Sequence, residues 1–168
     1  GRFEGTMGED PNLVSDMARS YVDGFQSTKT NGWGVNSVNT MIKHWPGGGT
    51  GEGGRDGHYG FGSYAVYPGD NIEEHMKIFT DGALNLNGNT LKASAIMPYY
   101  TIAEGNGEKV GSAYNSYLIS NILREKYQYD GVLCTDWGIT GDAFAVDVFF
   151  SGKSFGVENL TVAERHYK

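Results

Sequence analysis

Only one cysteine, Cys134, occurs among the 168 residues, so the chain can form no internal disulfide and no multi-cysteine metal site. No run of apolar residues is long enough to span a membrane. Basic residues are also in the minority, with 13 Lys and Arg against 20 Asp and Glu and a net charge of −7. Because phosphate groups bind basic patches, this balance argues against a nucleic-acid or anionic-membrane partner.

Aromatic residues and glycines are abundant. The composition is 39% hydrophobic and 13% aromatic, which is typical of a globular protein. The 26 glycines are about twice the average usage, and many lie between residues 46 and 69, which predicts long, shaped loops. An acidic chain rich in aromatics suits a neutral, hydroxyl-rich ligand better than a charged one.

Strand and helix signals alternate along the chain. We expect helices over 11–25, 71–83 and 112–127, and strands over 35–45, 91–100 and 131–136. This alternation predicts an α/β fold with parallel strands. No Gly-x-Gly-x-x-Gly follows a strand, so we expect no dinucleotide and no other cofactor.

Two of the helices have clear starts. Asp10 is expected to be the N-cap of the first helix, with Pro11 at its first position. Four apolar residues follow at helical spacing: Leu13, Met17, Tyr21 and Phe25. Asn71 is the expected cap of the second helix, whose apolar face we assign to Ile72, Met76, Phe79 and Ala83.

Polar side chains stand at the C-terminal end of each expected strand. Lys43 and His44 end the first, Tyr100 ends the second and Asp136 ends the third. In a parallel barrel or open sheet these ends converge on the face where ligands bind. Asp136 is the most informative, because a carboxylate at the end of a buried strand is costly unless it has chemistry to perform or a cation to meet.

Each of these residues also has a structural interpretation. Asp136 is either a catalytic group or a cap of the following turn. Lys43 and His44 either hold sugar hydroxyls or form a buried ion pair with a structural Asp or Glu. Tyr100 is either a hydrogen-bond donor to a nucleophilic carboxylate or a core tyrosine. The residues alone leave these alternatives open.

The pair Asp56 and His58 lies in the glycine-rich loop and is ambiguous. A carboxylate and an imidazole two residues apart form either an acid/base dyad or a loop staple, and we favour the staple. The histidines His44, His58 and His75 do not fall at metal-ligand spacings, so no metal is expected.

Five short motifs occur in a characteristic order: Gly1-Arg2, residues 8–11 (Gly-Glu-Asp-Pro), 43–47 (Lys-His-Trp-Pro-Gly), 97–100 (Met-Pro-Tyr-Tyr) and 135–137 (Thr-Asp-Trp). In this order they resemble glycoside hydrolase family 3, and within it bacterial β-glucosidases, over nearly the whole chain. The resemblance implies a (β/α)8 TIM-barrel-type first domain with parallel strands, followed by an α/β sandwich domain. It also implies hydrolysis of terminal non-reducing β-D-glucosyl residues by a retaining mechanism.

The resemblance also assigns roles to individual residues. Asp136 matches the catalytic nucleophile, Trp137 its stacking neighbour and Tyr100 the tyrosine beside it. Residues that match hydroxyl-binding positions for the nonreducing terminal sugar are Arg2, Lys43 and His44. The acid/base of the β-glucosidase branch is a Glu in the second domain, so no Glu of this chain is assigned that role. We expect residues 1–168 to be a piece of the barrel domain, truncated at both ends and inactive alone.

One departure keeps other activities open. The N-acetylglucosaminidase branch has a His where this chain has Gly48, and it takes its acid/base from an Asp-x-His dyad that Asp56 and His58 match in spacing. The alternatives are therefore a β-N-acetylhexosaminidase, a β-xylosidase or a non-catalytic sugar-binding fragment. The expected partner is a β-linked oligosaccharide or glucoside. Oligomeric state and localisation are not indicated, although a secreted or periplasmic location fits.

Overall fold

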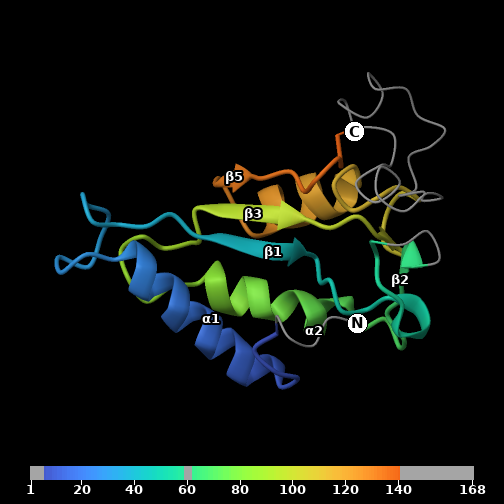
Figure 1. Cartoon of the computed structure of the whole chain (residues 1–168), viewed down its shortest axis with the longest axis horizontal. Helices are drawn as coiled ribbons and strands as arrows, with labels where there is room; N and C mark the ends of the chain where they lie inside the picture. The colour runs from blue at the N-terminus through green and yellow to red at the C-terminus, as the bar shows by residue number, and fades with distance from the viewer. Residues whose placement is uncertain (1–5, 59–61, 141–168) are drawn as a thin grey trace.

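The strands form a parallel sheet at the centre of the molecule. The computed structural model describes residues 6–58 and 62–140. Strands β1 (Met41–Trp45), β3 (Ala95–Pro98) and β5 (Val132–Leu133) pair in the order β1-β3-β5, all parallel. A second parallel pair, β2 (Tyr64–Ala65) and β4 (Ile102–Ala103), lies beyond their C-terminal ends (Figure 1). The predicted α/β alternation is confirmed, with shorter strands than expected.

Helix α1 (Pro11–Gln26) begins where the sequence predicts. The side chain of Asp10 accepts hydrogen bonds from the backbone N–H groups of Asn12 (2.9 Å) and Leu13 (3.2 Å), and Pro11 needs no such partner. The helix packs against the segment 78–83 with a face that includes Val14, Ser15, Val22 and Gln26, all buried.

The remaining helices separate the strands. Helix α2 (Ile72–Lys77) continues into η4 (Ile78–Ala83), and η5 (Tyr117–Lys126) precedes β5. Both η segments have π-type bonding, as in the 2.8 Å bond from Leu84 N to Phe79 O. A short 3₁₀ turn, η2 (Glu52–Gly54), lies in the glycine-rich loop.

The predicted apolar face of the second helix is confirmed, because Ile72, Met76, Phe79 and Ala83 are all buried. The predicted cap is wrong in one respect. Asn71 occupies the N-cap position, but its side chain makes no capping hydrogen bond.

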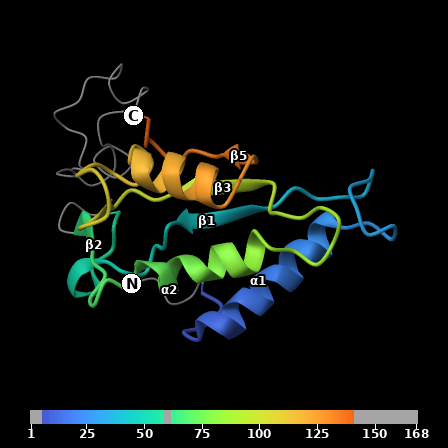
Figure 2. The ribbon, with the colours of Figure 1, turned by 180° about the vertical axis from the view of Figure 1, so that it is seen from behind.

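One face of the sheet packs on these helices. Ile42, Ile96 and Leu133, one from each strand, contact the main core, which continues into Met76 and Phe79 on one side and residues 118–123 of η5 on the other. Figure 2 shows α2 beside β1, and the helix of residues 117–126 beside β3 and β5. Because side chains alternate along a strand, the neighbouring residues face the opposite side. There Met41 and Val132 are exposed.

This one-sided packing is the arrangement of a partial barrel, in which helices cover the outside of a curved parallel sheet. Among the described residues, none of the helices is both long and apolar enough to cross a membrane.

Candidate functional site

Asp136 follows β5 in a tight turn. The ladder continues one residue past the strand, because Cys134 N donates to Ile96 O at 2.9 Å. The Asp136 carboxylate then accepts a hydrogen bond from Trp137 N at its Oδ1 atom (2.7 Å), and Ile139 N donates to Asp136 O (3.2 Å). The carboxylate is therefore held at the C-terminal end of the sheet, as predicted, with its side chain only 6% exposed.

His44 approaches the other oxygen of this carboxylate. Its Nε2 atom lies 3.4 Å from Asp136 Oδ2, which is an ion-pair distance when the imidazole is protonated. Oδ2 is buried and has no hydrogen-bond partner among the described residues. An unsatisfied buried carboxylate oxygen destabilises a fold by about 1–3 kcal/mol or more, so its persistence here calls for a functional explanation.

Two buried tyrosines support the turn that carries Asp136. The Tyr100 hydroxyl donates to Trp137 O (2.7 Å), and the Tyr114 hydroxyl donates to Ile139 O (2.9 Å). Burial, followed by the adjacent Asp136 carboxylate, raises the pKa of Tyr100 far above its ordinary value of 10.0. Tyr100 is thus a neutral hydrogen-bond donor beside Asp136 at any working pH.

Tyr114 was not among the predicted site residues. In the sequence it belongs to an amphipathic stretch and is indistinguishable from a core tyrosine. Only the fold shows that its hydroxyl reaches the turn after β5.

The structure brings together some of the predicted residues and not others. His44, Tyr100 and Asp136 converge as expected. Lys43 is exposed and makes no ion pair within the described part of the chain, so the alternative of a structural ion pair finds no support for this residue. Trp137 is 85% exposed, which leaves its ring face open to a ligand. Arg2 lies outside the described residues.

The Asp56–His58 pair lies in the same region. Asp56 Oδ1 accepts from His58 N (2.9 Å) and lies 2.6 Å from His58 Nδ1, so the pair does staple its loop. The His58 ring packs edge-on against Tyr99 and Tyr100, with centroids 5.7 Å and 5.3 Å apart. This loop therefore adjoins the strand-end site, which its position in the sequence did not reveal.

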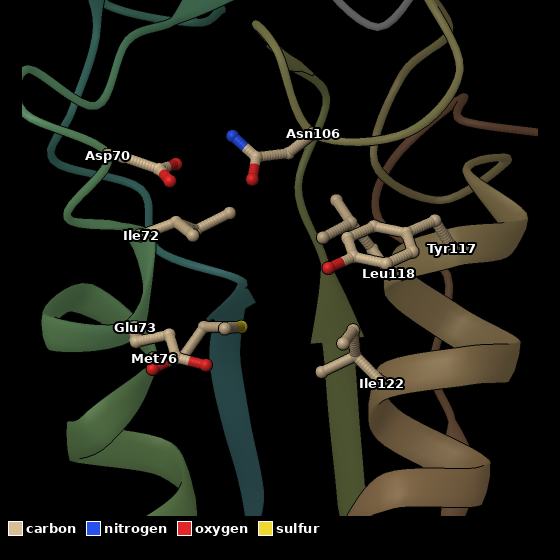
Figure 3. Close-up of a pocket in the computed structure, with 8 residues that line it drawn as sticks. All are labelled: Asp70, Ile72, Glu73, Met76, Asn106, Tyr117, Leu118 and Ile122. Carbon is tan, nitrogen blue, oxygen red and sulfur yellow. The ribbon is translucent and has the colours of Figure 1, made fainter.

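The cavity in Figure 3 is separate from this site. It measures about 210 Å³ and lies in the helical layer between α2 and η5, with Met76, Leu118 and Ile122 among its apolar lining and Asp70 and Asn106 also at its wall. None of the strand-end residues lines it. We interpret it as a packing gap between two helices that meet the sheet side by side.

No group of three or more His, Cys, Asp or Glu side chains within 6–58 and 62–140 is arranged to hold a metal ion. The chemistry of the strand-end site rests on a carboxylate, an imidazole and a phenol.

The buried tyrosines predict a steep alkaline transition. Burial is the largest cause of the raised pKa of Tyr67, Tyr100 and Tyr129. In the unfolded chain tyrosine ionises near pH 10, so the stability that these groups contribute is complete below about pH 10 and is lost as the pH rises further. We expect tyrosinate absorbance to rise first for exposed tyrosines and then, for the buried ones, together with the loss of helical circular dichroism. Full ionisation with the fold intact would contradict this.

Comparison with known proteins identifies the family of this chain. The sequence pattern described as "Glycosyl hydrolase family 3 N terminal domain" matches residues 1–150. The chain is 37% identical over 165 residues to "Probable beta-glucosidase C" of Aspergillus oryzae, covering 98% of this chain and 24% of that protein. It is 39% identical over 183 aligned residues to "Periplasmic beta-glucosidase/beta-xylosidase" of Dickeya chrysanthemi, covering 99% and 27%. The chain thus spans about a quarter of the length of these relatives.

Solved structures agree in fold. A β-glucosidase from Listeria innocua, solved in complex with isofagomine, superposes with a TM-score of 0.62 at 21% identity, covering 99% of this chain and 23% of that one. A β-glucosidase of intestinal bacteria involved in saponin metabolism superposes with a TM-score of 0.60 at 24% identity, covering 89% and 18%. With the strand-end cluster in place, the family pattern over residues 1–150 shows that this chain belongs to glycoside hydrolase family 3.

Proposed function

We propose that the chain is part of the barrel domain of a retaining glycosidase and carries its nucleophile, Asp136. The activity we favour is hydrolysis of terminal non-reducing β-D-glucosyl residues. The names of the relatives support glycoside hydrolysis, with β-glucosides as the substrates they share.

One observation carries the proposal: Asp136 Oδ2 is buried, faces His44 and receives no hydrogen bond from the residues that the structure describes. A structural carboxylate would direct both oxygens at donors, because unpaired buried oxygens are costly. Asp136 instead commits Oδ1 to the backbone and leaves Oδ2 for another partner. This arrangement suits a nucleophile, because lone pairs of Oδ2 stay available to attack carbon.

The reaction would proceed in two displacements. Ionised Asp136 attacks the anomeric carbon as the bond to the leaving oxygen breaks, and water then hydrolyses the glycosyl-enzyme ester. His44 and Tyr100 would steady the carboxylate from two sides, and the open face of Trp137 would pack on the C–H groups of the sugar. Arg2, Lys43 and His44 would bind hydroxyls.

The acid/base is not assigned within this chain. A retaining enzyme needs a second carboxyl group about 5–5.5 Å from the nucleophile to protonate the leaving oxygen. We propose that residues of the intact protein outside 1–168 supply it. Those residues would also decide between glucose and xylose, which differ only by a hydroxymethyl group.

Covalent labelling of the intact protein tests the mechanism. An activated fluoro-sugar slows the second displacement, so a working nucleophile stays glycosylated. We expect one adduct, on the peptide that contains Asp136, after digestion and mass spectrometry. Sugar binding without an adduct would indicate a non-catalytic sugar-binding protein, and an adduct elsewhere would rule out Asp136.

A second candidate, β-N-acetylhexosaminidase activity, is favoured by the Asp56–His58 pair beside Tyr99 and Tyr100. A carboxylate-oriented imidazole that packs against Tyr100, the tyrosine beside Asp136, is suited to proton transfer. Comparing kcat/KM on an aryl β-glucoside and an aryl N-acetyl-β-glucosaminide separates the two. Preference for the acetamido sugar, lost in His58→Ala, would favour this candidate over ours.

A further inference from the structure

Tyr99 is a buried residue for which the proposed chemistry has no use. It follows β3 directly, and its backbone N donates to Trp45 O at 2.9 Å, tying the ends of β1 and β3 together. Its ring packs against the His44 imidazole in a tilted arrangement, with centroids 4.6 Å apart and an angle of 36° between the ring planes. Tyr99 therefore contacts the histidine that faces Asp136.

The β-ladder is irregular at His44. In the register of β1 with β3, Lys43 pairs with Met97 and Trp45 with Pro98, and the irregularity falls at His44 between them. An irregularity of this kind re-aims the side chain at its position, so packing around the imidazole contributes to its orientation. The Tyr99 ring is one such packing contact, and aromatic pairs have preferred geometries.

Tyr99 is held in turn by the loop that carries the Asp56–His58 staple. Its hydroxyl lies 3.4 Å from Asp56 Oδ1 and 3.3 Å from His58 Nδ1. Because the 2.6 Å contact between Asp56 Oδ1 and His58 Nδ1 uses the Nδ1 proton, the Tyr99 hydroxyl donates to the carboxylate.

The loop packs closely against Tyr99 at Gly57. A Cβ atom at Gly57 would lie 2.8 Å from Tyr99 Cε1 and 2.6 Å from Thr101 Cγ2, closer than real Cβ contacts. Any side chain there would push the loop or Tyr99 out of place. Gly49, in the same glycine-rich region, has no atom within 4 Å of such a Cβ and no positive φ, so it is a matched control.

From these contacts we propose that Tyr99 is a positioning residue that sets the orientation of His44 toward Asp136. Tyr99 is itself held by the loop of residues 56–58. The described residues of this loop reach the reacting carboxylate through two aromatic contacts, from His58 to Tyr99 and from Tyr99 to His44. This inference rests on the proposed function for its effect on catalysis, whereas its structural content, the orientation of His44, does not.

The activity test uses variants of the intact protein. We expect Tyr99→Leu and Gly57→Ala each to lower kcat/KM by roughly threefold to tenfold, the effect of losing one aromatic contact. Tyr99→Phe keeps the ring on His44 and should lose less than Tyr99→Leu, and Gly49→Ala should match the wild type. A Gly57→Ala variant as active as Gly49→Ala would overturn the proposal.

A double-mutant cycle distinguishes positioning from general packing. If Tyr99 acts through His44, Tyr99→Leu should lower kcat/KM much less in a His44→Ala background than in the wild type. Equal losses in both backgrounds would assign Tyr99 a merely structural role. His58 could instead act as a proton donor. In that case His58→Ala should lower kcat/KM only for substrates with poor leaving groups, and this result would overturn the positioning role of the loop.

A spectroscopic measurement keeps the two proposals apart. In NMR spectra of protein with isotope-labelled histidine, the His44 ring signals are the ones absent in His44→Ala. We expect these signals to shift in Tyr99→Leu and Gly57→Ala and to stay in place in Gly49→Ala. Shifts without any glycosidase activity would refute the proposed function while supporting the positioning of His44. Unchanged ring signals would refute the positioning role whatever the activity.

Discussion

Replacing Asp136 by Asn is expected to lower turnover of an aryl β-glucoside by the intact protein by on the order of 10⁴-fold or more, because an amide cannot form the glycosyl ester. Asn keeps the acceptor that Trp137 N uses, so the turn after β5 should survive. Initial rates under single-turnover conditions measure the loss, and the fluoro-sugar should no longer label the peptide.

The same substitution should leave the protein as stable as before, or more stable. It replaces a buried carboxylate, one oxygen of which has no hydrogen-bond donor among the described residues, by a neutral amide, and burying an amide costs less than burying a charge. Thermal unfolding by circular dichroism measures this. Asp16→Asn is a suitable control, since Asp16 is an exposed α1 carboxylate paired with Arg19 and should retain full activity. Near-normal turnover in Asp136→Asn would eliminate Asp136 as the nucleophile.

Replacing Trp45 by Ala is expected to lower the free energy of unfolding by roughly 3–5 kcal/mol. Trp45 is fully buried at the end of β1, packs edge-on against Phe79 with centroids 5.4 Å apart, and donates from Nε1 to Leu118 O at 3.2 Å. The truncation would open a cavity between α2, η5 and the sheet and leave the Leu118 carbonyl without this donor. Urea unfolding of the variant and the wild type gives the difference.

Trp33→Ala is the matched control for this experiment. Trp33 is half exposed, so its removal should change the free energy of unfolding far less. Equal effects of the two substitutions would contradict the central position assigned to Trp45. Because Trp45 adjoins His44 in the chain, the Trp45→Ala variant should also lose activity under conditions where it remains folded.

The first helix shows which structural features the local sequence predicts and which it does not. Its start was predictable, because capping by Asp10 and the fixed φ of Pro11 depend only on neighbouring residues. The apolar spacing of Leu13, Met17, Tyr21 and Phe25 correctly indicated a helix. Yet these four side chains are 42–59% exposed, and the buried positions lie one residue further on, at Val14 and Val22. Periodicity specifies a helix, whereas the packing partner specifies which face is buried.

Some residues of the candidate site could likewise be predicted from the sequence, and others could not. The strand-end positions of His44, Tyr100 and Asp136 followed from the βα alternation, since parallel strands place their C-terminal ends at one edge. Tyr99, Tyr114 and the Asp56–His58 loop joined the site only through contacts between residues distant in sequence, and such contacts leave no local pattern. Lys43 shows the converse, because adjacency to His44 did not give it an ion pair with Asp136.

Three features follow from the order of residues in the sequence: the α/β alternation, the start of the first helix and the ordered motifs that identify the family. Only the fold shows that Asp136 Oδ2 has no donor among the described residues and that the His44 ring packs on Tyr99. The physical reason is that hydrogen-bond satisfaction and ring packing depend on distances between chain segments, which only the folded arrangement of β1, β3 and β5 defines.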